Sequence, residues 1–156
     1  VRGRRGRDLL LGYYRDEAAT AEVFQGGWLH TGDIGSFDVA GNLFFHGRKK
    51  EIIKRAGENI SVIEVEEALV EHPYVIDVAV IGIPDKIRDQ AVKAFVVLQP
   101  DRTVTPAELQ EFCAKRLAYF KLPTFFEFVT ELPRNASGKL LRRELETRAA
   151  QDANGR

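Results

Sequence analysis

The chain has 156 residues, of which 44% are hydrophobic and 29% are charged, so it fits one ordinary globular domain or a small domain plus part of another. Its 23 basic and 23 acidic side chains cancel, which argues against a nucleic-acid-binding protein, because such proteins carry a basic surface. No apolar run reaches the roughly 20 residues that a helix needs to cross a bilayer, and no signal peptide is visible. We therefore expect a cytoplasmic protein without a membrane span, in which the single cysteine, Cys113, is buried in the core.

The first 14 residues combine an arginine- and glycine-rich segment with a short apolar run. Residues 1–7 could be a phosphate-binding arm, but they fit better as the exposed end of a strand from a larger protein. Residues 9–14 are predicted to form that strand. Asp16 can then cap a short alanine-rich helix, which Gly26 ends.

A β-hairpin is predicted around residues 38–41, because Gly41 can adopt the positive φ of a tight turn. If the turn centres there, opposed residues have numbers that sum to roughly 81, which places Asp33 across from Arg48. A carboxylate accepts two hydrogen bonds from a vicinal diol and a guanidinium donates several, so this pair could hold a ribose. From spacing alone, an ordinary cross-strand ion pair remains the alternative.

A second domain is predicted from Glu51 onward. Ser61 and Glu64 have the spacing of a capping box that begins a helix, and Pro73 ends that helix. Thr105 begins another helix through a second capping box. The remaining predicted elements are strands at 51–54, 75–83, 92–98 and 125–129, loops at 56–59 and 84–89, a helix at 140–148 and a disordered tail at 151–156. This order predicts an α+β fold, a small open sheet covered by helices and preceded by the hairpin.

Residues 133–139 form a loop that ends in Gly138 and Lys139. This pair invites comparison with the phosphate-binding loop GxxxxGK[ST]. However, Pro133 stands where the first glycine belongs, and Leu140 stands where a Ser or Thr would hold Mg²⁺. The segment is therefore not a phosphate-binding loop of that kind.

Four segments together resemble the ordered motifs of the adenylate-forming enzyme superfamily, which contains acyl-CoA synthetases, peptide-synthetase adenylation domains and luciferases. They are TGD at 31–33, GRKK at 47–50, KRAGENI at 54–60 and PRNASGK at 133–139. The resemblance implies that residues 1–49 are the end of a larger N-terminal domain, that Lys50 is a hinge, and that residues 51–150 are a mobile C-terminal lid. A hinge must absorb a large change in φ and ψ, which suits an exposed charged residue; a merely solvated lysine is the alternative for Lys50.

The resemblance also implies a reaction in two steps. A carboxylic acid and ATP form an acyl-adenylate, and the thiol of CoA then displaces AMP. The implied residues are Asp33, Arg48 and Lys139 for ATP and AMP, with Lys139 catalytic, and Ala56, Gly57, Glu58, Asn59 and Arg88 for CoA. A plain surface arginine remains the alternative for Arg88. Mg²⁺ would be bound through the nucleotide and the N-terminal domain, and no metal site is expected here, because the histidines lack ligand spacing.

Within the superfamily, residues 54–61 and 83–98 look most similar to carnitine/crotonobetaine-CoA ligases and medium-chain acyl-CoA synthetases. The expected partners are the protein's own N-terminal domain, a carboxylic acid, ATP and CoA, and the fragment alone is expected to be inactive. The alternative is a stand-alone CoA-binding or protein-interaction module. Half of an apolar strand pair at the start argues against it, whereas tight binding of CoA or AMP to the isolated chain would favour it.

Overall fold

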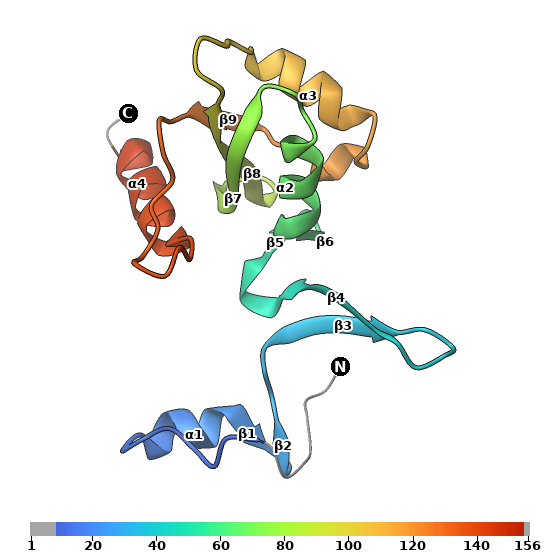
Figure 1. Ribbon diagram of the computed structural model, residues 1–156, viewed down its shortest axis with the longest axis vertical. Coiled ribbons are helices and arrows are strands. Elements are labelled where there is room, and N and C mark those ends of the chain that lie inside the picture. The colour runs from blue at the N-terminus through green and yellow to red at the C-terminus, as the bar shows by residue number, and fades with distance from the viewer. Residues whose placement is uncertain (1–8, 155–156) are drawn as a thin grey trace. The chain divides into compact units, whose positions relative to one another are not determined.

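The computed structural model describes residues 9–154. They fall into two compact units that meet between Lys50 and Glu51. Figure 1 shows the elements of both units along the chain. None of the helices within residues 9–154 has the length and apolar character to cross a membrane.

The first unit opens with a short helix, α1 (Glu17–Val23). Asp16 caps it as predicted, because its carboxylate accepts a hydrogen bond of 2.8 Å from the backbone N–H of Ala19. A two-stranded ribbon follows, β1 (Phe24–Gln25) with β2 (Trp28–Leu29). The predicted strand at 9–14 is wrong: the described residues of that segment make only one isolated bridge, between Tyr13 and Asp16. A strand needs a neighbour for its hydrogen bonds, and the segment pairs with none here. Residues 1–7 lie outside the described residues.

The predicted hairpin is confirmed. Strands β3 (Asp33–Phe37) and β4 (Leu43–Arg48) pair antiparallel, and Asp33 lies opposite Arg48. Asp38 holds the turn, since its carboxylate accepts hydrogen bonds from the side chain and backbone of Asn42 at 2.8 and 2.9 Å. These bonds lower the pKa of Asp38 below its ordinary value. Gly41 has φ +85°, which explains the glycine at this position.

The second unit contains a five-stranded sheet in which β8 (Asp89–Leu98) is central. Strand β7 (Val75–Asp85) lies antiparallel along one side of it, and β9 (Phe125–Phe128) lies parallel along the other. The short hairpin of β5 (Ile52–Arg55) and β6 (Glu58–Ser61) joins the sheet where Arg55 pairs with Asp89.

Helices cover both faces of this sheet, which confirms the predicted α+β fold. The helices are α2 (Val62–Val70), α3 (Pro106–Ala114) and α4 (Arg142–Asn154). Side chains alternate along β7, so Val80 is buried in the core with α2 and α3, whereas Ala79 is buried with α4. Figure 1 shows α4 on one side of the sheet and the other two helices opposite.

Several predicted boundaries in this unit are wrong. Residues 58–59 lie on β6 and not in a loop, so only Ala56 and Gly57 form the turn. The loop at 84–89 shortens to residues 86–88, because β7 and β8 continue their pairing to Asp85 and Asp89. The last helix begins at Arg142 and continues to Asn154, so residues 151–154 are helical rather than disordered. Residues 155–156 lie outside the described residues.

One of the two predicted capping boxes does not form. Thr105 and Glu108 form theirs, with the carboxylate of Glu108 accepting the Thr105 backbone N–H at 2.7 Å. Ser61 makes no side-chain cap hydrogen bond to α2. The carboxylate of Glu64 is instead 2.5 Å from the ammonium of Lys121, a residue far along the chain. A long-range ion pair has therefore replaced the local cap.

Cys113 is buried in the core, as predicted. Burial raises the pKa of its thiol to about 11, with Arg116 opposing the shift. The thiol therefore stays protonated near neutral pH and is a core residue without nucleophilic character.

A buried arginine fastens the second unit together. Arg55 is only 6% exposed, and its guanidinium donates to the carbonyls of Phe120 and Leu122 at 2.9 and 3.1 Å and to the hydroxyl of Thr124 at 3.2 Å. These bonds tie β5 to the short 3-10 helix η2 (Tyr119–Lys121) and the segment after it. Arg55 thus provides hydrogen-bond donors to two backbone carbonyls and a hydroxyl of this segment.

We expect Arg55→Ala to lower the free energy of unfolding by about 3 kcal/mol, because it removes charged hydrogen bonds and leaves buried carbonyls unpaired. Urea unfolding followed by circular dichroism measures this. The control is Arg143→Ala, which removes an exposed guanidinium and should change stability by less than about 0.5 kcal/mol. Equal effects of the two substitutions would contradict a structural role for Arg55.

Candidate functional site

The hairpin presents Asp33 and Arg48 as a pair on one of its faces. Their backbones are opposed in the β3–β4 register, and the Nε atom of Arg48 lies 3.4 Å from Oδ1 of Asp33. The side chains are 38% and 55% exposed, so a ligand can reach both. The pair combines two acceptor oxygens with remaining guanidinium donors, which is the donor and acceptor set that a ribose diol and its phosphate require.

Lys139 lies at the end of a well-ordered loop. The side chain of Asn135 organises this loop, because its Oδ1 accepts from the backbone N–H groups of Ser137 and Lys139 at 3.1 and 2.9 Å and from the Ser137 hydroxyl at 2.8 Å. Gly138 has φ +80°, and the N–H of Asn135 donates back to the Lys139 carbonyl at 3.0 Å. The loop thus holds its own backbone without using the lysine side chain.

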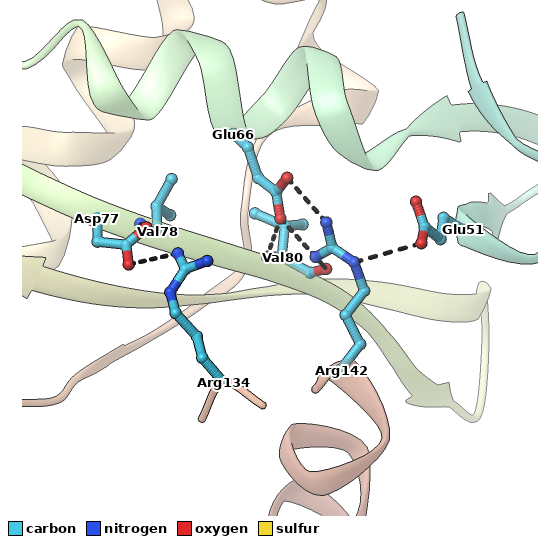
Figure 2. Close-up of polar contacts among 7 residues, drawn as sticks. All are labelled: Glu51, Glu66, Asp77, Val78, Val80, Arg134 and Arg142. Carbon is cyan, nitrogen blue, oxygen red and sulfur yellow. Dashed lines mark hydrogen bonds and ion pairs between the residues drawn. The ribbon is translucent and has the colours of Figure 1, made fainter. Parts of the chain in front are cut away.

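Arg134 fastens the loop to the sheet. Its guanidinium donates to the Gly138 carbonyl at 2.9 Å and to Oδ2 of Asp77 on β7 at 2.7 Å. Figure 2 shows this arginine reaching up to Asp77 from below the strand. Lys139 itself is exposed, and its ammonium has no ion-pair partner within residues 9–154. The loop therefore presents a free cation from a fixed backbone.

The residues predicted to line a CoA channel gather at another edge of the unit. Ala56 and Gly57 have φ of +50° and +87° and form the two-residue turn between β5 and β6. The backbone N–H of Ala56 donates to the Arg88 carbonyl at 2.9 Å, so this turn and the β7–β8 turn lie side by side. Glu58 and Asn59 follow on β6 and are exposed.

An open pocket of about 490 Å³ lies beside this edge. It contains Arg55 from β5, Arg88 from the β7–β8 turn, Gln110 from α3, and Tyr119 and Thr124 around η2. Sequence reasoning named only Arg88 from this set. The others are far from it along the chain, so no local pattern connected them with Arg88.

The second unit therefore carries two separate candidate surfaces. The Lys139 loop leads directly into α4, and Leu140 packs with that helix on one face of the sheet. The pocket beside Arg88 is lined by α3, which packs on the opposite face. Lys50 is exposed in the 3-10 turn η1 (Lys49–Glu51), where the two units meet.

An exposed carboxylate–guanidinium pair in a hairpin and an exposed lysine on a clamped loop of an α+β unit form the arrangement that the sequence predicted for the C-terminal portion of an adenylate-forming enzyme. Residues 64–139 match the AMP-binding enzyme C-terminal domain. The match covers most of the second unit, which therefore carries this domain.

Individual proteins and solved structures also resemble this chain. The crotonobetaine/carnitine-CoA ligase of Salmonella typhimurium is 44% identical over 147 residues, which cover 94% of this chain and 28% of that protein. The o-succinylbenzoate CoA synthetase MenE of Bacillus subtilis, solved with its acyl-adenylate OSB-AMP, is similar with a TM-score of 0.85 and 40% identity. That similarity covers 91% of this chain and 29% of MenE.

ATP-bound MatB from Rhodopseudomonas palustris is similar with a TM-score of 0.81 and 33% identity, over 88% of this chain and 27% of MatB. The chain thus spans between a quarter and a third of the length of each of these proteins.

Proposed function

We propose that this chain works as the C-terminal part of an AMP-forming ligase that joins a carboxylic acid to CoA. The observation that carries the proposal is the free ammonium of Lys139 on a loop clamped by Asn135 and Arg134. A rigid, unpaired cation is suited to stabilise charge that develops in a transition state. The names of relatives, which include CoA ligases and a synthetase holding an acyl-adenylate, support the same reaction class.

In the first step, a carboxylate oxygen attacks the α-phosphorus of ATP. The bond from that phosphorus to the oxygen bridging to the β-phosphate breaks, and pyrophosphate leaves. Lys139 would lie beside the carboxylate and the α-phosphate, which repel each other as they approach, and would reduce that repulsion. Asp33 would accept hydrogen bonds from the ribose hydroxyls while Arg48 contributes donors nearby.

In the second step, the sulfur of CoA attacks the acyl carbon. The bond from that carbon to the AMP oxygen breaks, and the thiol proton passes to solvent. The turn at Ala56 and Gly57 would border the path of the pantetheine arm, and Arg88 would approach a CoA phosphate. Apart from Gly57 and its two chain neighbours, no described residue has an atom within 4 Å of where a Gly57 side chain would begin, so the turn leaves that space open.

Both steps require one active site, yet the Lys139 loop leads to the α4 face of the sheet, whereas the pocket beside the Gly57 edge is lined by α3 from the opposite face. A rigid rotation of the second unit about Lys50 would present them in turn. Such a hinge suits the position of Lys50 in an exposed turn between two compact units. Residues 51–150 would then form the mobile lid and residues 1–49 the end of the domain that holds the nucleotide.

Mg²⁺ would enter the reaction bound to ATP. Residues 9–154 contain no group of three His, Cys, Asp or Glu side chains placed to hold a metal. The remaining partners under this proposal are an N-terminal domain, a carboxylic acid, ATP and CoA, and we expect the reaction to take place in the cytoplasm.

The test uses the full-length enzyme that carries this chain, supplied with ATP and acids such as carnitine, crotonobetaine or medium-chain fatty acids. We expect AMP and pyrophosphate in equal amounts, with the acyl-CoA detected by mass spectrometry. Without CoA, the acyl-adenylate should accumulate. Release of ADP, or thioester formation without AMP, would contradict the proposal. Tight binding of CoA or AMP to residues 1–156 alone would instead favour a stand-alone binding module.

Asp33→Asn tests the ribose contact. An amide has one acceptor oxygen where the carboxylate has two, so we expect kcat/KM for ATP to fall about 30-fold through the loss of a charged hydrogen bond. The control is Asp101→Asn, at an exposed position with φ +60° that asparagine also accepts. Unchanged kcat/KM in the Asp33 variant would indicate that Asp33 and Arg48 form only a cross-strand ion pair.

A further inference from the structure

Arg142 joins four elements of the second unit at one point. Its guanidinium donates to both carboxylate oxygens of Glu66 on α2, at 2.6 and 3.0 Å, and to the carbonyl of Val80 on β7 at 3.2 Å. Its Nε atom lies 3.7 Å from the carboxylate of Glu51, directly before β5. Figure 2 shows this guanidinium between Glu66 and Glu51 at the start of α4.

The contacts of Arg142 differ in strength. Burial alone would lower its pKa, but the hydrogen bonds and charge of Glu66, with smaller contributions from Glu51 and Glu146, raise it above the ordinary value. Glu66 also accepts the backbone N–H of Val80 at 2.8 Å, so Arg142 and Glu66 together satisfy both backbone groups of Val80 on edge strand β7. These bonds fix the guanidinium on the body of the unit. The contact with Glu51 is the longer one, and it alone reaches the residue next to the hinge.

Arg142 is also only three residues after Lys139. The Lys139 loop closes through the bridge between Arg134 and Leu140 and through the N–H of Leu141, which donates to the Pro133 carbonyl at 2.8 Å. The end of this loop is therefore continuous with Arg142, and the guanidinium of Arg142 contacts Glu51. The backbone from Lys139 to Arg142, together with the ion pair between Arg142 and Glu51, thus links Lys139 to the residue that follows Lys50.

We propose that Arg142 and Glu51 are positioning residues that transmit rotation at Lys50 to the Lys139 loop. This inference rests on the proposed function. A hinge positions a distant side chain accurately only if the chain leaving it is fixed to the body that moves. With the ion pair in place, a change in φ and ψ at Lys50 turns Glu51, Arg142 and the Lys139 loop as one body. Without it, the segment at 51 bends locally, and Lys139 stops short of the reacting atoms.

Breaking the contact between Arg142 and Glu51 should therefore affect one half-reaction more than the other. Adenylation depends on Lys139 and should suffer when the connection is broken. Thioester formation depends on the β5–β6 turn, which follows directly along β5 and does not pass through Arg142. Neither Glu51 nor Arg142 contacts a substrate in this scheme, so kcat of adenylation should change while KM does not.

The test is Glu51→Gln in the full-length enzyme. We expect kcat of adenylation, measured by ATP–pyrophosphate exchange, to fall about 5-fold, the scale of one partly exposed ion pair. KM for ATP and thioester formation from supplied acyl-adenylate should change less than about 2-fold. The matched control is Glu71→Gln, which breaks the 2.6 Å ion pair with Arg116 away from the hinge and should leave both half-reactions unchanged.

A double-mutant cycle tests whether the two residues act through one contact. If they do, Glu51→Gln should add nothing to the loss caused by Arg142→Gln. A second readout does not depend on activity: trypsin should cleave the Arg142 variant after Lys49 and Lys50 faster than the parent enzyme, as mass spectrometry can identify.

Equal losses in both half-reactions, additive effects of the two substitutions, or unchanged cleavage would overturn the inference. An inactive parent enzyme would overturn the proposed function instead, so the two failures can be told apart.

Discussion

Replacing Lys139 by alanine in the full-length enzyme is expected to lower the rate of acyl-adenylate formation about 1,000-fold while leaving thioester formation from supplied adenylate within about 3-fold of the parent rate. A cation about 4 Å from the developing charge contributes on the order of 4 kcal/mol at an effective dielectric near 20. The ammonium is exposed and has no protein partner within residues 9–154, so its removal should not disturb the fold. Pyrophosphate exchange measures the first half-reaction, and release of AMP from supplied adenylate measures the second.

The matched control is Lys115→Ala. Lys115 also carries an exposed ammonium. Its Nζ atom lies 3.4 Å from Oε1 of Glu111 at the surface of α3. This variant should keep both rates. Equal loss of the two half-reactions in the Lys139 variant would show that the lysine acts on stability or on a common step, and not on adenylation.

Gly57→Leu is expected to slow thioester formation and to leave adenylation nearly unchanged, the opposite of the Lys139 variant. The rate of thioester formation should fall about 100-fold, because a side chain here enters the space proposed for the pantetheine arm, and misplacement of a reactant by about 1 Å has effects of that size. Adenylation should stay within about 3-fold, since Lys139 is held by a different loop on the other face of the sheet. Single-turnover transfer from acyl-adenylate to CoA is the measurement.

The substitution also strains the turn, because Gly57 has φ +87°. Gly41→Leu is the control for this strain, since Gly41 has φ +85° and equally open surroundings. A leucine at positive φ is unfavourable by about 1–2 kcal/mol at either position. If both variants lose thioester formation equally, strain explains the loss and the proposed CoA path is wrong.

Local features of the sequence were enough for several structural predictions. The turn at Gly41 brought Asp33 close to Arg48, because antiparallel register follows from the position of the turn. A β-bulge between Ile34 and Gly35 then shifts the register by one residue, and this shift places Asp33 directly opposite Arg48. The Thr105 capping box formed because both partners lie within four residues of each other. The buried Cys113 followed from its place on an apolar helical stripe. The residue roles in catalysis came from resemblance to a family, and they stay predictions.

Other predictions failed where a distant residue competed. Glu64 matches a capping box with Ser61, yet its carboxylate pairs with Lys121, which is 57 positions away. Residues 58–59 looked like a loop because glycine precedes them, but pairing with β5 makes them a strand. In each case a partner that is remote in sequence offered a stronger interaction than the local pattern did.

The sequence by itself determined the α+β class, the presence of the hairpin and the motifs that point to an adenylate-forming enzyme. These depend on turns, periodicity and residue types within short windows. Only the tertiary structure decided that Arg134 clamps the Lys139 loop to Asp77, that Arg142 reaches Glu51, and that α4 and α3 cover opposite faces of the sheet. The physical reason is that hydrogen bonds and ion pairs of long side chains depend on which strands and helices become neighbours, and that is established only when the whole sheet has formed.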